Sequence, residues 1–273
     1  MKRLLVPTDF SEQAEHALKI AVEIAKKRNS EIYLLHSIEL PVHLATGGGS
    51  SGLPESLFYM KLAEKRFNDF REMPFLEGVD IHEIIGRSEI FEDINETCEK
   101  HEIDLIVMGS TGASGFKEMF VGSNTEKVVR TSNTPVLVIK NNLSNFNISD
   151  FVFATDFSEK FEDAFKKAKV FAEDIGAKIH LLYVNTPANF KTSADIHSMM
   201  ENFISGMNLK NYTLNVYNDT SVEKGILNFS NFINAELIGM ATHGRKGISH
   251  FLNGSISEDM ENRVDMPIIT FKI

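Results

Sequence analysis

Asp104-Leu-Ile-Val-Met-Gly-Ser-Thr-Gly112 is an apolar run that ends in two spaced glycines, and it returns near the end of the chain as Glu236-Leu-Ile-Gly-Met-Ala-Thr-His-Gly244. An apolar run without alternating polar residues is typical of a strand buried on both faces of a parallel sheet. Helices must cover such a sheet and connect its strands. Two copies of the segment therefore predict two α/β domains of one kind.

The duplication extends over most of the chain. Val6-Pro-Thr-Asp-Phe-Ser-Glu12 returns 147 positions later as Phe153-Ala-Thr-Asp-Phe-Ser-Glu159, whereas Gly122-Ser123 returns only 132 positions later as Gly254-Ser255. The shorter spacing implies that the first half carries an insertion. Its glycine-rich stretch 46–52 is a place where an insertion costs little.

The fold class is therefore α/β, with two tandem Rossmann-like domains. We predict domains at 1–141 and 149–273, joined by a polar linker at 142–148. Each domain is predicted to be a five-stranded parallel doubly wound sheet with helices on both faces. In the first half, the apolar runs predict strands at about 2–7, 31–38, 79–85, 104–108 and 135–140. Ligands of such sheets bind beyond the carboxyl ends of the strands, where the strand order reverses.

Composition excludes several classes of function. The chain has 273 residues, a net charge of −10 and an estimated pI of 5.4, and its longest basic run is 26–28, so a nucleic acid partner is disfavoured. No apolar run approaches the roughly 18 residues of a membrane span, and no export signal is evident. The single cysteine, Cys98, agrees with a reducing compartment and is expected to be a buried structural thiol. We expect a cytoplasmic protein.

The glycines of the first copy form a longer motif. Gly109-Ser-Thr-Gly112 is followed by nine residues, then by Gly122-Ser123 and a helical pattern that begins near Asn124. Glycines let a backbone approach phosphates, and the N–H groups at a helix start attract anions. Because no Gly-Lys-Ser/Thr sequence ends the motif, a P-loop NTPase is disfavoured.

This motif resembles that of the universal stress proteins whose members bind ATP. The resemblance covers nearly the whole chain, including the opening strand that ends Pro7-Thr8-Asp9 and the second strand that ends His36-Ser37. It implies an adenine nucleotide alpha hydrolase-like fold and bound ATP, with Mg²⁺ as the accompanying ion. It also implies that the two halves form a pseudo-dimer through their last strands, and that two chains can pair in turn, with 268–271 as an exposed edge.

The resemblance also implies roles for single residues. Asp9 corresponds to the position beside the adenosine, and Ser37 to the position where backbone groups meet the adenine edge. The first two motif glycines are expected near ribose and the first phosphates, and Gly122, Ser123 and Asn124 near the outer phosphates and the divalent ion. The full set of expected nucleotide-binding residues is Pro7, Thr8, Asp9, Ser37, Met108, Gly109, Gly112, Gly122, Ser123, Asn124, Thr125, Asp156, Val184, Gly244, Gly254 and Ser255.

The second half departs from the motif in one place. Ala241 stands where the first half has Gly109, although Asp156 is kept and Arg245 and Lys246 add positive charge. If this position needs a positive φ, alanine costs about 1 kcal/mol or more. Whether the second half binds nucleotide is left open.

Several residues also have simpler interpretations. Ser123 precedes Glu126 by three positions, as Ser255 precedes Glu258, which is the capping-box pattern. Asp9 and Asp156 have the sequence context of residues that order a turn. Five histidines (His36, His43, His101, His243 and His250) lack zincin or zinc-finger spacing, so no protein metal site is expected. The acidic run 89–102 predicts a solvated helix face.

Three functions remain. The leading one is a regulatory module in which bound ATP favours one conformation or assembly and is hydrolysed slowly if at all, so no catalytic residue is assigned. A nucleotide-free dimeric scaffold is the alternative, and an ATP-hydrolysing or adenylate-forming enzyme is a third. The regulated protein partner is not identifiable from the sequence.

Overall fold

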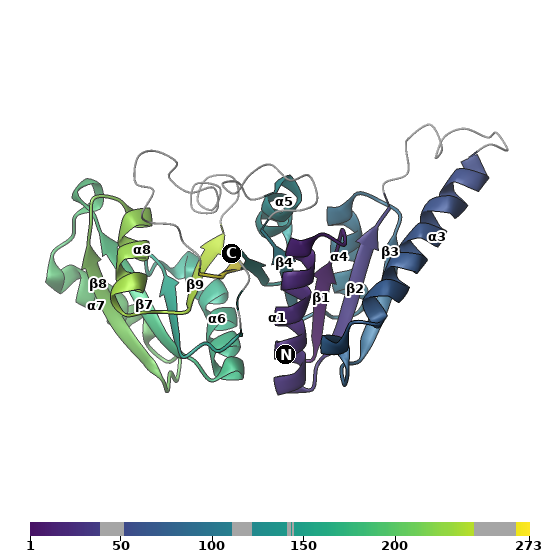
Figure 1. Cartoon of the computed structure of the whole chain (residues 1–273). Coiled ribbons are helices and arrows are strands. Elements are labelled where there is room, and N and C mark those ends of the chain that lie inside the picture. Colours follow the sequence, from purple (N-terminus) through teal and green to yellow (C-terminus); the bar gives the residue numbers. More distant parts are fainter. Residues whose placement is uncertain (39–51, 111–121, 141–142, 144, 243–265) are drawn as a thin grey trace. The chain divides into compact units, whose positions relative to one another are not determined.

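The structure is a computed structural model that describes residues 1–38, 52–110, 122–140, 143, 145–242 and 266–273 (Figure 1). Four residues expected to bind nucleotide lie outside this part of the chain: Gly112, Gly244, Gly254 and Ser255. The glycine-rich stretch 46–52 also lies outside it, apart from its last residue.

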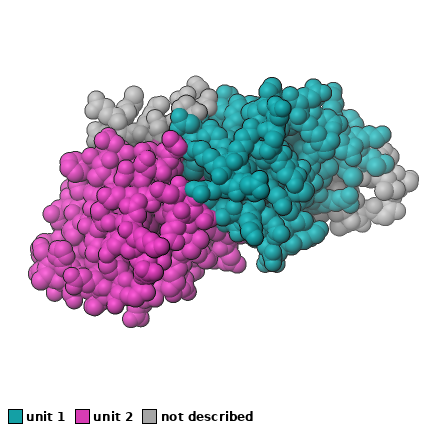
Figure 2. All heavy atoms as spheres, turned by 90° about the horizontal axis from the view of Figure 1, so that it is seen from below, with its two compact units in different colours: residues 1–128, 142–146 teal, residues 129–141, 147–273 magenta. Residues whose placement is uncertain are grey.

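The chain forms two compact units, coloured separately in Figure 2. Unit 1 comprises Met1–Val128 and Asn142–Phe146, and unit 2 comprises Val129–Asn141 and Asn147–Ile273. The segment 129–141, which the sequence assigns to the first domain, packs with unit 2. The domain limits 1–141 and 149–273 remain a prediction.

Unit 1 is a parallel sheet with strand order β3-β2-β1-β4. Its elements are β1 (Arg3–Pro7), α1 (Glu12–Arg28), β2 (Glu31–Ser37), α3 (Gly52–Arg71), η1 (Pro74–Leu76), β3 (Ile81–Gly86), α4 (Ile90–Lys100), β4 (Leu105–Gly109) and α5 (Ser123–Thr131), the last of which continues into unit 2. All four strands agree with the predicted positions. The apolar runs of β1 and β4 are buried on both faces, since Leu4, Leu5, Leu105 and Ile106 are fully shielded from solvent.

Unit 2 has the strand order β5-β10-β9-β6-β7-β8. Its elements are β5 (Val136–Ile139), β6 (Asp150–Ala154), η2 (Glu159–Phe161), α6 (Glu162–Ile175), β7 (Lys178–Asn185), η3 (Pro187–Asn189), α7 (Ser193–Ile204), β8 (Tyr212–Asn218), α8 (Val222–Phe232), β9 (Leu237–Thr242) and β10 (Ile268–Lys272). The neighbours from β10 to β8 pair in parallel. The doubly wound α/β fold is confirmed, with helices on both faces of the strands (Figure 1).

The last strands of the two sequence halves pair with each other. β5 and β10 run antiparallel, with Ile268 opposite Val138 and Thr270 opposite Val136. β10 also pairs with β9, and Ile268, Ile269 and Phe271 are fully buried. The expectation that 268–271 provides an exposed edge for a second chain is therefore wrong, because both sides of β10 are already occupied by strands of the same chain.

Helix α1 shows how local sequence sets the element limits. The Ser11 hydroxyl accepts the Ala14 N–H at 3.3 Å, and Asn29 ends the helix in the left-handed conformation with its N–H donated to the Ala25 carbonyl. The predicted apolar face is confirmed by the burial of its members, Ala14, Leu18, Ala21, Val22 and Ala25.

Helix α4 corrects the interpretation of the acidic run. Its outer positions are solvated as expected, but Asp93 is only 7% exposed and lies on the same face as Ile94, Thr97 and the buried Cys98. A spacing of three to four residues places these side chains against the sheet. In the described residues, no helix is both long and apolar enough to cross a membrane.

His101, at the end of α4, gives the fold a pH dependence. Burial, followed by the charge of Lys100, lowers the pKa of His101 below its ordinary value of 6.5, and its ring lies 4.7 Å from the ring of Tyr33. The unfolded chain takes up this proton near pH 6.5 and the folded chain only at lower pH. The contribution of His101 to stability is therefore complete above pH 6.5 and is lost as the pH falls.

We expect His101→Gln to lose stability less steeply than the parent chain between about pH 7 and about pH 5.5. Urea denaturation at a series of pH values measures the two slopes. Equal slopes would contradict the assignment of this proton uptake to His101.

Candidate functional site

The carboxyl ends of β1 and β4 form the point where the strand order of unit 1 reverses. The chain passes from β1 through β2 to β3 on one side, and then returns to the other side of β1 as β4, with Leu4 opposite Leu105. Crevices at such points bind ligands in open α/β sheets. Pro7 is the last residue of β1 and Gly109 the last residue of β4, so the structure brings two parts of the predicted site together.

The turn after β1 is built by its own polar side chains. The Phe10 N–H donates to the Thr8 hydroxyl at 3.0 Å, and the Ser11 N–H donates to Asp9 Oδ1 at 3.0 Å. Asp9 therefore does order the turn, as its simpler interpretation predicts. Its side chain is also exposed at the carboxyl edge of the sheet, so the turn role and a ligand role are compatible.

Phe10 holds this turn in an uncommon conformation. Its φ of 62° is rare for a bulky residue, and its ring packs against His36, Phe67 and Phe70 at centroid distances of 4.6, 5.2 and 5.1 Å. Arg66 lies over the same ring at 5.7 Å. The aromatic contacts hold the phenyl ring on the α3 side. Strain of this kind is found at functional sites.

Ser37 places a polar atom at the carboxyl end of β2. Its Oγ is buried and has no hydrogen-bond partner within the described part of the chain. The neighbouring His36 is fixed by a 2.8 Å contact between Nδ1 and the Thr8 carbonyl, which joins the ends of β2 and β1. A buried hydroxyl without a partner costs stability and is a position where a ligand can supply the missing hydrogen bond.

Gly109 is needed for a reason that the sequence did not give. Its φ is not in the left-handed region, so the suggested need for a positive φ is wrong. A Cβ at this position would instead lie 2.8 Å from the carbonyl oxygen of Gln13 in α1. The glycine lets β4 approach the helix backbone, and Met108 just before it is buried.

The start of α5 lies beside the end of β4. The Gly122 N–H donates to the Ser110 carbonyl at 2.7 Å, and the Thr125 hydroxyl donates to the Gly109 carbonyl at 2.9 Å. The Gly122 carbonyl accepts the Glu126 N–H at 3.0 Å, so the helix begins at Ser123. The capping box at Ser123 is therefore wrong.

Ser123 and its neighbour Asn124 are exposed in the first turn of α5. The N–H groups of a first helical turn have no partner within the helix, and the helix dipole favours negative charge there. This position can hold an anion.

The second half repeats the turn but fills the site differently. Phe157 has a φ of 58°, and the Ser158 N–H donates to Asp156 Oδ1 at 2.9 Å. Lys160 also pairs with Asp156 Oδ2 at 3.2 Å.

At the end of β7, Val184 replaces Ser37, and a Cβ on Gly225 of α8 would overlap its methyl group. An apolar side chain packed against α8 thus stands at the position that carries a polar hydroxyl in unit 1. Thr242, at the end of β9, has a buried Oγ1 without a partner among the described residues.

Sequence reasoning missed three residues that shape the site of unit 1. Gln13 explains the glycine of β4, Arg66 adds a cation near the β1 turn, and Asp93 supports the end of β3. Of these three residues, only Asp93 could have been identified from the sequence, because its helical spacing with Ile94 and Thr97 indicates a buried position.

Comparisons with known proteins agree with this geometry. Residues 1–140 match the model of the universal stress protein family. Two universal stress proteins of Methanocaldococcus jannaschii are similar: one is 30% identical over 51% of this chain and 82% of its own, and the other is 35% identical over 51% and 94%. The crystal structure of a universal stress protein from Archaeoglobus fulgidus covers 99% of this chain and 96% of its own, with 25% identity and a TM-score of 0.68. The chain belongs to the universal stress protein family.

Proposed function

We propose that unit 1 binds ATP as a regulatory ligand at the carboxyl ends of β1, β2 and β4. The observation that carries the proposal is the buried hydroxyl of Ser37, which lacks a partner among the described residues and lies where the resemblance places the adenine edge. Adenine offers both donors and acceptors at its edge, so it suits a hydroxyl.

The remaining groups suit the other parts of a nucleotide. Asp9 is exposed beside the expected ribose, and a carboxylate accepts hydrogen bonds from ribose hydroxyls. The first turn of α5 suits the outer phosphates, where Ser123 and Asn124 supply exposed oxygen atoms. Mg²⁺ would be held there between phosphate oxygens and such side chains. The Thr125 hydroxyl is already bonded to Gly109, so only its backbone is expected to contribute.

We expect turnover to be slow. Asp9 is the candidate base from the sequence, and one of its oxygens accepts the Ser11 N–H. A base held in this way is poorly placed to activate water. The proposal is therefore an ATP-dependent switch, in which the nucleotide favours one state because it binds that state more tightly.

Unit 2 suits a nucleotide less well. Lys160 neutralises Asp156, and Val184 removes the hydroxyl expected at the adenine edge. The cost of a positive φ does not count against Ala241, since the corresponding Gly109 of unit 1 has no positive φ. We propose one nucleotide per chain.

The second candidate is a nucleotide-free scaffold. The antiparallel β5–β10 pair favours it, because this pair joins the last strands of the two halves and suits the proposed pseudo-dimer. The two candidates differ in whether nucleotide is bound.

Acid release from gently purified protein, with chromatography and mass spectrometry, tests the proposal. We expect about one equivalent of ATP per chain, and calorimetry on stripped protein in Mg²⁺ should show binding of ATP but not of GTP. Two equivalents would overturn the restriction to unit 1. If no nucleotide is released and calorimetry shows no binding, the ATP proposal is overturned and the nucleotide-free scaffold is the remaining candidate.

A further inference from the structure

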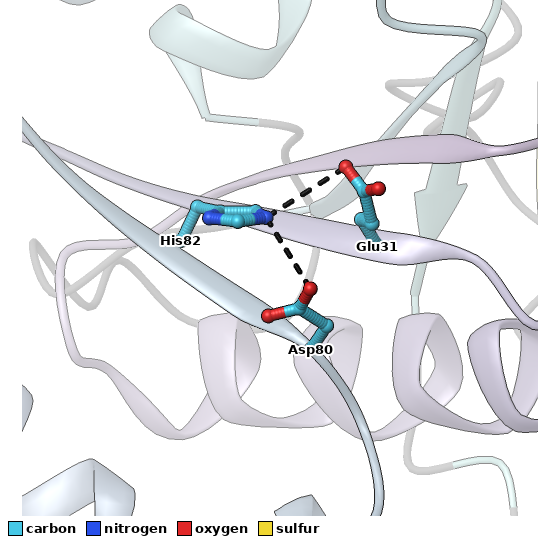
Figure 3. Close-up of side chains that lie close together, drawn as sticks. All are labelled: Glu31, Asp80 and His82. Carbon is cyan, nitrogen blue, oxygen red and sulfur yellow. Dashed lines mark ion pairs between the residues drawn. The ribbon is translucent and has the colours of Figure 1, made fainter.

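Three metal-ligating side chains meet at the amino ends of β2 and β3, the opposite edge of the sheet from the proposed nucleotide site. Glu31 begins β2, Asp80 precedes β3 and His82 lies within β3 (Figure 3). His82 Nε2 is 3.7 Å from Glu31 Oε2 and 3.7 Å from Asp80 Oδ2. One ligand atom from each residue lies within 4.8 Å of the other two.

The pairing of the two strands brings these residues together. Ile32 is opposite Ile81 and Tyr33 is opposite His82, and the Ile32 N–H donates to the Asp80 carbonyl at 2.8 Å. Side chains two residues apart share a face of a strand. Asp80 and His82 therefore project to one face, on which Glu31 also lies.

Tyr33 holds two of the three ligands in place. Its hydroxyl donates to Glu31 Oε2 at 3.2 Å, and its ring lies 4.8 Å from the ring of His82. Partners that orient ligands in this way are typical of metal sites.

Ion pairing alone gives this cluster little reason to persist. Half-exposed ion pairs contribute about 1 kcal/mol or less, and a neutral imidazole would leave two carboxylates facing each other. Arg3 lies 3.9 Å from Glu31 through Nε, but its Nη1 donates to Glu102 and to the His101 carbonyl. A divalent cation would balance both carboxylates at once.

We propose that Glu31, Asp80 and His82 bind a first-row divalent metal ion such as Zn²⁺, with the remaining coordination positions taken by water. One imidazole nitrogen and carboxylate oxygens are the ligands that such ions accept. Bonds of about 2.0–2.2 Å place neighbouring ligand atoms roughly 3.4 Å apart around a tetrahedral ion. The distances of 3.7 Å are close to this value, and the Asp80 carboxylate is 70% exposed and can rotate to complete the set.

Calorimetric titration of the full chain with ZnCl₂, after removal of metals by a chelator, tests the site. We expect one equivalent to bind, and His82→Gln and Asp80→Asn each to weaken this binding at least tenfold. Tyr33→Phe keeps all three ligands and should weaken binding by about tenfold, as expected for an orienting partner. Circular dichroism without metal verifies that each variant is folded.

His16→Gln is the matched control. His16 also lies beside a carboxylate, with Nε2 3.8 Å from Glu12 Oε1. Among the described residues, no third metal-ligating side chain lies close enough to complete a site there. This variant should bind Zn²⁺ like the parent chain. Parent-like binding by His82→Gln, or equal losses in both histidine variants, would overturn the site. The nucleotide is absent throughout, so failure here leaves the proposed ATP site untouched.

Discussion

Ser37→Ala is expected to weaken Mg²⁺-ATP binding by about tenfold or more, and at the same time to stabilise the nucleotide-free chain by about 1 kcal/mol. Both effects come from the Ser37 Oγ, which lacks a hydrogen bond in the free protein and is proposed to gain one in the complex. The Ser37 Oγ is buried without a partner among the described residues, so its removal relieves a desolvation cost in the free protein. In the complex, the same oxygen is proposed to bond with the adenine edge, and its removal costs about 1.4 kcal/mol per tenfold loss.

Calorimetry measures the loss of affinity, and urea denaturation without nucleotide measures the gain in stability. Thr242→Val is the matched control, since it removes from unit 2 a buried hydroxyl that also lacks a partner among the described residues, and it preserves the side-chain shape. It should raise stability and leave ATP affinity at the parent value. A Ser37→Ala chain that binds ATP like the parent would remove the observation on which the proposed function rests.

The sequence predicts the elements of this fold better than their contacts. A strand that is buried on both faces has an unbroken apolar run in its sequence. The run at Leu105 and its neighbours, which are buried in the structure, therefore predicts a strand. The pairing of β5 with β10 was implied by the family resemblance, but the strands' own pattern carries no comparable signal. The apolar pattern of the strands 136–139 and 268–272 would be the same whether they lay at an exposed edge of a sheet or paired with each other inside it.

The site shows the same division. The repeat of Asp9 at Asp156 located the turn after the first strand of each half, and local hydrogen bonds confirm it in both. The sequence suggests two reasons for Gly109, close approach to phosphate and a positive φ, whereas the structure adds the close approach of Gln13, almost a hundred positions away, and shows no positive φ. A close approach between distant backbone segments depends on helix packing, which local sequence does not encode.

Asp93 is the clearest case of a residue whose role depends on long-range packing, and its loss has the largest expected effect on stability. Its carboxylate accepts the N–H groups of Arg87 at 3.3 Å and Ser88 at 3.2 Å, which fixes the turn between β3 and α4. Gly86 pairs with Ser37 in the sheet, so the turn adjoins the proposed adenine position. A side chain at Gly86 would overlap the Asp93 carboxylate, which explains the glycine.

We expect Asp93→Ala to destabilise the chain by about 2–3 kcal/mol, because two backbone donors lose a buried charged acceptor. Gly86→Ala should cost about 2 kcal/mol in the parent chain through overlap with the carboxylate. In the Asp93→Ala background the two nearest overlapping atoms, Oδ2 and Cγ, are gone and only the Cβ of residue 93 remains, at 2.9 Å. The same change should therefore cost about 1 kcal/mol less, which is the coupling expected of residues in contact. Urea denaturation of the two single variants and the double variant measures this cycle. Additive costs for Gly86 and Asp93 would show that the glycine is required by something other than the Asp93 carboxylate.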